Sequence, residues 1–285
     1  MPSPLTTPYE DSINAEFLPN ESLWAAVEPL LPLRSFPCGR GRKPKTDKQM
    51  FYAIYYILRT GIHRVAGRWK ALPRCLGAAS TVHDRFQQWV KAGVFYKLWH
   101  HGLLELKVEG KLDWEFQSID GCQTKAPLAG QATGANPTDR GKKGVKRHLL
   151  TETHGLPIGL VVTGANRHDK TQVEQVLETM PLLPPIPTEE SPQHFCADKG
   201  YDYQDVRSVV DFWQYEQHIK SRGEEKQACR TPSYRARRWV CERTHSWLNR
   251  FRRLLIRWEK KVDNYLAMLH LACAFIVWKN SVIFG

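Results

Sequence analysis

The sequence contains no paired cysteine motif and no long apolar run. Its seven cysteines form an odd set without a Cys-x-x-Cys pair, which predicts reduced thiols and excludes a disulfide framework or a zinc ribbon. The longest apolar stretch near a terminus, 266–278, is shorter than the roughly 20 residues that cross a bilayer. The first residues lack a basic segment followed by an apolar run, so we expect no secretory signal and a cytoplasmic location.

Acidic residues are in the minority. The 285 residues carry 41 Lys and Arg against 29 Asp and Glu, and the formal net charge is +12. The charge is uneven, at +6 over 1–114, −3 over 115–220 and +9 over 221–261. An acidic centre between two basic regions favours a nucleic-acid enzyme, because phosphate-binding surfaces then surround a carboxylate site that holds metal. A merely basic surface is the alternative.

Residues 1–114 have the pattern of short helices joined by basic connections. The segment 46–49 has the spacing of a helix capping box, apolar residues recur at i, i+3 and i+4 over 50–58, and Gly61 follows as a stop. A second helix is predicted over 80–91, and its polar face would present Arg85 and Gln88 to the bases of a DNA major groove. This indicates a helix-turn-helix module. A helical bundle with a solvated polar face is the alternative.

A basic loop with two glycines occupies 37–45. Glycine lets the backbone approach another surface closely, and the loop is similar to minor-groove arms of the AT-hook type. We therefore expect its cations to contact DNA, whereas a solvated linker is the alternative reading. These cations are Arg40, Arg42, Lys43 and Lys45.

From residue 115 the pattern changes from helical to alternating. Strands are predicted over 115–120, 145–152, 156–163, 194–198 and 215–220, and helices over 169–180, 203–213, 234–258 and 263–282. The order βββαβαβα is that of an RNase H-like α/β core, a mixed five-stranded sheet flanked by helices. We therefore expect a helical, helix-turn-helix-like DNA-binding domain over 1–114 and an RNase H-like catalytic domain over 115–285.

Three carboxylates stand at positions that suit a metal site. Asp120 ends the predicted strand FQSID before Gly121, which permits close approach of a ligand, and Asp198 ends HFCAD. Glu242 lies in the long basic helix, on the side away from the predicted core. Each one alone could be a turn, cap or ion-pair residue. Converging at one edge, they would form an acidic cluster for two divalent cations, Mg²⁺ or Mn²⁺ rather than zinc, because no Cys or His cluster has ligand spacing.

Four motifs in order extend this reading: QSIDG at Asp120, GANRHD at 164–169, ADKGYD at Asp198 and WVCERTHSWLNRFRRL at Glu242. Together they resemble the Asp-Asp-Glu transposases of bacterial insertion sequences, of the insertion-sequence-five type. The N-terminal segments LWAAVEPLLP, GRGRKPK, AIYYILRTGIHR and RFQQWVKAGVF resemble the helical DNA-binding region of the same family.

The resemblance implies a DNA transposase. Such an enzyme binds the terminal inverted repeats of its element as a dimer or larger assembly, cleaves at the ends and joins the 3′-OH to target DNA. Asp120, Asp198 and Glu242 would then be the catalytic and metal-binding triad. A simple metal-dependent endonuclease, a transposase-derived DNA-binding regulator and a defective copy are the alternatives.

Further DNA contacts follow from the same resemblance. Arg238 fits the family's Tyr-Arg-Glu-Lys signature, whereas Tyr234 is displaced by one position and Asn249 stands where the Lys is expected. We therefore expect other cations to contact phosphates. Separately, we interpret two other aspartates, Asp169 and Asp202, as helix caps. The expected phosphate contacts are Lys146, Arg147, Arg238, Arg250 and Arg253.

Overall fold

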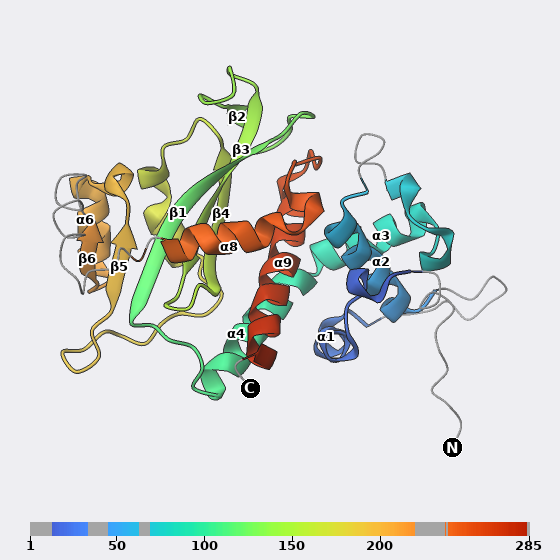
Figure 1. The fold of residues 1–285 in the computed structure, drawn as a ribbon, viewed down its shortest axis with the longest axis horizontal. Coiled ribbons are helices and arrows are strands. Elements are labelled where there is room, and N and C mark those ends of the chain that lie inside the picture. Colours follow the sequence, from blue (N-terminus) through green and yellow to red (C-terminus); the bar gives the residue numbers. More distant parts are fainter. Residues whose placement is uncertain (1–12, 34–44, 63–68, 220–236, 238, 284–285) are drawn as a thin grey trace.

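The chain forms an elongated molecule in which a helical region and a sheet region lie at opposite ends (Figure 1). The computed structural model describes residues 13–33, 45–62, 69–219, 237 and 239–283. No helix within these ranges is long and apolar enough to cross a membrane. The five cysteines that they include are free thiols, as predicted from the absence of paired motifs.

The amino-terminal region is helical, as predicted. Its longest early helix, α2, begins where the capping box predicts, because the Thr46 hydroxyl accepts a hydrogen bond of 3.2 Å from the Gln49 N–H. The helix ends at Gly61, whose φ of +72° is left-handed. The elements are η1 (Ala15–Phe17), α1 (Glu21–Val27), η2 (Glu28–Leu30), α2 (Asp47–Thr60), η3 (Trp69–Ala71), η4 (Arg74–Leu76), α3 (Ala79–Lys91) and α4 (Val94–Val108).

The remainder of the chain is built on one mixed sheet, with the strand order β4-β3-β1-β5-β6. Strands β1, β3 and β4 are antiparallel neighbours, whereas β1, β5 and β6 run parallel. This is the predicted RNase H-like arrangement. One short strand, β2, pairs with the start of β3 and was not predicted. The strands are β1 (Phe116–Lys125), β2 (Gly134–Ala135), β3 (Lys143–Thr151), β4 (Pro157–Gly164), β5 (His194–Ala197) and β6 (Glu216–Ile219).

Helices cover both faces of the sheet. On one face α5 packs against β3 and β4, and α6 packs against β6. On the other face α8 crosses β1 and β3 (Figure 1), and the Cys241 thiol donates to the Leu149 carbonyl at 3.3 Å. The helical elements here are η5 (Asp169–Gln172), α5 (Val173–Glu178), η6 (Lys199–Tyr201), α6 (Gln204–Phe212), α8 (Trp239–Asn249), η7 (Arg252–Leu254) and α9 (Val262–Ile283).

The carboxy-terminal helix α9 joins the two regions, because it packs along α4. Trp99 of α4 stacks on His270 of α9, with ring centroids 5.5 Å apart, and its indole N–H donates to the Pro157 carbonyl of β4 at 2.9 Å. The buried apolar side chains of both regions form one continuous core. The helical region is therefore fixed against the sheet by side-chain packing rather than by chain connectivity alone.

The predicted helix over 234–258 is wrong in its extent. Helix α8 ends at Asn249, because the chain then turns to pair with the end of β1: the Arg257 N–H donates to the Lys125 carbonyl at 2.8 Å. The predicted helix over 169–180 is also shorter, and it ends at Glu178. Tertiary pairing overrides local helical periodicity in the first case.

Candidate active site

Asp120 lies in the middle of β1, so its expected position at a strand end is wrong. Residues on both sides of it pair with β3, and Asp120 itself is opposite Leu149. The parallel pairing of β1 with β5, however, stops at Ser118 opposite Cys196. Asp120 therefore lies just beyond the last β1–β5 pair, where the edge of β1 that faces β5 is no longer paired.

Asp198 follows β5 directly, as predicted. It is two residues after Cys196, which pairs with Ser118, and Ser118 is two residues before Asp120, so Asp198 and Asp120 lie on the same face of the sheet. Its Oδ1 atom accepts a hydrogen bond of 2.7 Å from the Gly200 N–H, so Asp198 is the N-cap of η6. The second carboxylate oxygen stays available to a ligand. The cap thus fixes the side chain without using all of its acceptor capacity.

Glu242 is exposed in the first turn of α8, and this matches the predicted orientation away from the core. Its neighbour Cys241 is anchored on Leu149, the residue opposite Asp120. The buried positions are Val240, Cys241, Thr244, His245 and Leu248.

The pKa of Asp120 reflects the other carboxylates that lie near it. The pKa of Asp120 is raised from 3.8 to about 6, chiefly by burial and also by the nearby charges of Asp198, Glu242 and Asp169. A hydrogen bond from the Gly121 N–H acts in the opposite direction. Among the described residues, no Lys or Arg forms an ion pair with these three carboxylates. The site therefore has an excess of negative charge.

His245 contacts Asp120 but does not supply the missing positive charge. Its Nε2 atom lies 3.4 Å from the Asp120 carbonyl and 3.9 Å from Oδ2. Burial, together with the nearby charge of Arg147, lowers the pKa of His245 to about 3. The imidazole is neutral at physiological pH, so it positions the backbone of Asp120 without neutralising the carboxylate.

A fourth carboxylate, Asp169, lies behind Asp120 on the opposite face of β1. A Cβ atom on Gly121 would come within 2.0 Å of its Oδ1 atom. The Lys146 ammonium donates to its Oδ2 atom at 2.9 Å, and His148 Nδ1 lies 3.3 Å from Oδ1. Although burial raises the pKa of Asp169, His148 and Lys146 lower it below its usual value. Asp169 is thus a paired carboxylate that supports the strand.

The interpretation of Asp169 as a helix cap missed this role, since its side chain faces β1 instead of the first turn of its own element. The glycine at position 121 could have indicated this contact, because a residue without a Cβ atom lets another group approach the backbone closely. In the structure that group is the Asp169 side chain. Asp202 forms an ion pair with Arg207 at 2.8 Å on the surface.

Four cations that we expected on the surface are buried instead, so their predicted position is wrong. Arg85 pairs with Asp47, and Lys146 pairs with Asp169. Arg147 donates to Asn249 at 2.9 Å, and Arg253 forms an ion pair of 2.6 Å with Glu259. Each partner lies far along the chain or beyond the predicted helix, and helical periodicity alone does not reveal such pairs.

The other expected DNA contacts differ in placement. Lys45, Gln88 and Arg250 are exposed. Arg250 lines a groove between the helical region and α8, together with Arg59, Arg252 and Lys279. The expected contacts Arg40, Arg42, Lys43 and Arg238 lie outside the described residues.

Two family matches agree with this geometry. Residues 112–277, more than half of the chain, match the family described as "Transposase DDE domain", and residues 20–99 match "Putative transposase of IS4/5 family". The chain therefore belongs to the DDE transposase family. It is a DNA transposase, in a family of DNA-cleaving and DNA-transferring enzymes that use divalent metal ions.

Among particular relatives, the chain is 37% identical over 150 residues to a putative transposase for insertion sequence element IS402 of Burkholderia cepacia. That alignment covers 52% of this chain and 69% of the relative. A 16.2 kDa uncharacterized protein of IS402 from the same organism is 31% identical over 125 residues, which cover 41% of this chain and 80% of that protein.

Solved structures of Mos1 transposase are more distant. The Mos1 mariner paired-end complex with Mn aligns over 86% of this chain and 82% of that chain, at 11% identity and a TM-score of 0.26. A pre-cleavage Mos1 transpososome gives 9% identity and a TM-score of 0.27, over 87% and 82% of the two chains.

Proposed function

We propose that this transposase binds the terminal inverted repeats of its own insertion sequence, cleaves at the element ends and joins the freed 3′-OH to target DNA. Asp120, Asp198 and Glu242 are its catalytic and metal-binding residues in this proposal. The observation that supports it is the group of three carboxylates, which form no ion pair with a Lys or Arg among the described residues and in which the pKa of Asp120 is raised to about 6.

The residues at the site fit a hard divalent cation, Mg²⁺ with Mn²⁺ as a substitute. Carboxylate oxygens are the ligands that these ions prefer, and the excess negative charge around Asp120 favours a bound cation. When bound, two such ions would activate the attacking oxygen and stabilise the leaving 3′-oxygen. Asp120, Asp198 and Glu242 would hold them.

The chain's own contribution is to hold these carboxylates in place. Cys241 and His245 of α8 bind the backbones of Leu149 and Asp120, and the N-cap contact orients Asp198. Asp169, held by Lys146, closes the back of β1. Carboxylates fixed in advance lose little entropy when they take up a cation or a phosphate.

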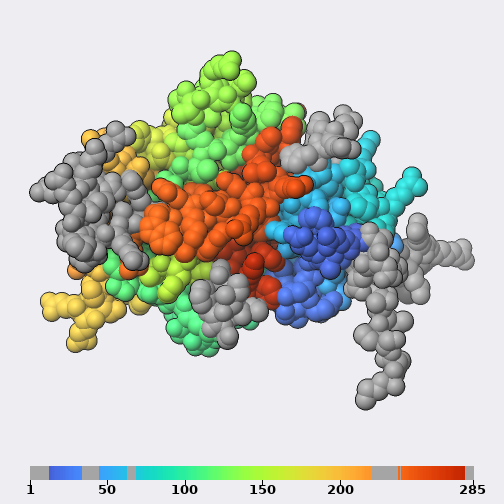
Figure 2. All heavy atoms as spheres, in the orientation of Figure 1, coloured from blue at the N-terminus to red at the C-terminus, as the bar shows by residue number. Residues whose placement is uncertain are grey.

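DNA would cross the molecule between its two regions. Helix α8 and the turns after it form the orange surface at the centre of Figure 2, beside the blue amino-terminal helices. The described residues that line the groove at this junction include the cations Arg59, Arg250, Arg252 and Lys279 and the acidic Glu16, which lies 4.0 Å from Arg59. Four cations in one groove suit a phosphate backbone. We include the exposed Lys45 and Gln88 among the contacts.

Two further elements of the proposal are an assembly and a location. Two element ends must be held together for transposition, so we propose a homodimer or a larger complex on double-stranded DNA. The protein would act in the bacterial cytoplasm, associated with the nucleoid. The division into a DNA-binding domain over 1–114 and a catalytic domain over 115–285 is part of the same proposal.

The groove is tested with Arg250→Gln, and Arg253→Gln serves as the matched control. Loss of one phosphate contact should weaken binding to all DNA sequences and reduce the slope of log K against log salt by about 1. The buried Arg253, paired with Glu259, should instead affect thermal stability. Equal salt slopes for Arg250→Gln and the unmodified protein would exclude this groove as the DNA path.

A further inference from the structure

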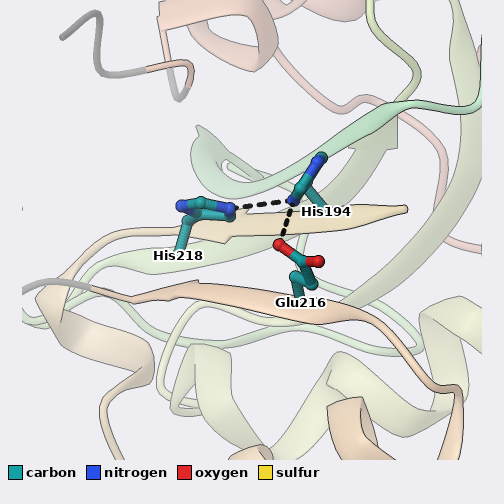
Figure 3. A group of neighbouring side chains, drawn as sticks. All are labelled: His194, Glu216 and His218. Atoms are coloured by element: carbon teal, nitrogen blue, oxygen red, sulfur yellow. Dashed lines mark hydrogen bonds and ion pairs between the residues drawn. The ribbon is translucent and has the colours of Figure 1, made fainter. Parts of the chain in front are cut away.

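A second group of metal-ligating side chains lies at the start of β5 and β6, on the same sheet face as Asp120. His194 is directly opposite Glu216 in the parallel register, and His218 is two residues further along β6. Alternate residues of a strand share a face, so Glu216 and His218 both point to the side of His194. Figure 3 shows the three side chains directed toward one another.

The donor atoms of this group stand close together. His194 Nδ1 lies 3.1 Å from Glu216 Oε2 and 3.0 Å from His218 Nε2 (Figure 3). One ligand atom from each residue lies within 4.8 Å of the others. Donors around a tetrahedral zinc ion, with bonds of about 2.0–2.1 Å, are separated by about 3.3 Å. The side chains therefore already have nearly the spacing that one ion requires.

The chemistry of the donors selects a different ion from the one that suits the carboxylate site. Two imidazoles and one carboxylate favour a first-row transition ion, whereas Mg²⁺ prefers oxygen ligands alone. The His194 side chain is 15% exposed and that of Glu216 is 61% exposed, so an ion can enter from solvent and retain water ligands. We propose that His194, Glu216 and His218 bind one transition-metal ion of the Zn²⁺ type at this sheet edge.

The position of the group indicates what such an ion would do. Among the described strands, β6 pairs only with β5, through four positions, and the ion would join the two strands by side chains as well. His194 also stacks on Phe116 at 4.5 Å, and the Arg237 guanidinium lies 3.7 Å from the centroid of that ring. The ion would thus stabilise the sheet edge and a stack that reaches the residues before α8.

The group of His194, Glu216 and His218 could not be predicted from sequence spacing. His194 and His218 are 24 residues apart and belong to different strands, so no ligand-spacing motif is present. Only the parallel register of β5 and β6 brings them together. The sequence analysis considered only ligand spacing along the chain, and such spacing does not reveal a group assembled from two strands.

The test uses the full chain, stripped of metal with EDTA, and carries Asp120→Asn so that the carboxylate site is weakened. Zn²⁺ is titrated by calorimetry, and Co²⁺ is added to record the visible absorption of imidazole-ligated, low-symmetry cobalt. We expect one equivalent bound without thiolate charge-transfer bands. At a hundredfold excess of Zn²⁺ over its Kd, the unfolding midpoint should rise by about 5 °C.

Three variants and a control decide the assignment. Glu216→Gln should weaken Zn²⁺ binding by about tenfold or more, and His194→Ala or His218→Ala should abolish it. His101→Ala is the control, because His101 lies 3.7 Å from Glu105 but belongs to no three-ligand group among the described residues. Its Zn²⁺ affinity should be unchanged.

The proposal fails if Glu216→Gln and His218→Ala bind Zn²⁺ as tightly as His101→Ala does. It also fails if the folded Asp120→Asn protein binds no Zn²⁺ at all. Circular dichroism in EDTA checks folding. Glu216→Gln, a conservative change at an exposed side chain, keeps the test decisive if the histidine variants do not fold.

Discussion

Asp120 of β1 and Asp169 of η5 lie on opposite faces of β1, and their surroundings shift their pKa values in opposite directions. Asp169 has Lys146 and His148 beside it, and its pKa is lowered. Asp120 has Asp198 and Glu242 nearby and a neutral His245, and its pKa is raised to about 6. A carboxylate with its own internal cations supports structure, whereas one surrounded by other carboxylates is arranged for a cation from outside.

The largest expected effect is on catalysis. Asp198→Asn should bind end DNA normally and cleave it at least about 10³-fold more slowly, because an amide is a poor ligand for a divalent ion. Asparagine is as good an N-cap as aspartate, so η6 should persist. Binding is measured by gel shift and cleavage on labelled element ends. Loss of binding together with cleavage would assign Asp198 a structural role instead.

Removing the paired carboxylate should reduce stability. Asp169→Ala leaves the Lys146 ammonium, which is buried, without its carboxylate partner and should lower the free energy of unfolding by about 2–4 kcal/mol. Chemical denaturation measures this. Asp205→Ala is the control, because Asp205 pairs with Lys170 on the surface and its loss should be undetectable. Equal effects of the two substitutions would contradict the supporting role of Asp169.

The contact behind β1 is tested by a double substitution. Gly121→Ala would place a Cβ atom 2.0 Å from Asp169 Oδ1 and should destabilise the fold by about 1–3 kcal/mol. In the background of Asp169→Ala the same change should cost much less, since the clashing group is gone. Additive losses of stability in the double variant would show that the close approach is not the reason for glycine here.

The smallest effect is a pH dependence. Because the pKa of Asp120 is raised by folding, its contribution to stability is complete below pH 3.8 and is lost as pH rises through about 6. In EDTA, Asp120→Asn should therefore be more stable than the unmodified protein above pH 6, by about 1–2 kcal/mol after allowance for partial exposure. The difference should disappear below pH 4. Thermal melts across this range measure it, and a constant difference would contradict the raised pKa.

Much of the fold was predictable from the sequence, because it rests on local patterns. The capping box at Thr46, the stop at Gly61 and the existence of β3 and β4 each follow from a few neighbouring residues. The order of strands and helices then left few topologies for the sheet. Asp198 was placed correctly after its strand for the same reason.

What sequence reasoning missed depends on partners that are distant along the chain. It did not indicate that Arg85 would be buried against Asp47, or that the residues after Asn249 would leave the helix to pair with β1. The role of Asp169 required the two faces of β1 to be known. These are tertiary effects, and a pattern of apolar residues in one segment carries no information about them.

The central claim is tested most directly by a cleavage and joining assay on a plasmid that carries the DNA naturally flanking this gene. The unmodified protein is compared in Mg²⁺ and in EDTA, and Asp120→Asn is compared in Mg²⁺. We predict Mg²⁺-dependent cuts at inverted repeats, followed by joining to a second DNA, with neither product in EDTA or with Asp120→Asn. Cleavage that persists in EDTA, or that is unchanged by Asp120→Asn, would contradict the assignment of this carboxylate cluster as the active site.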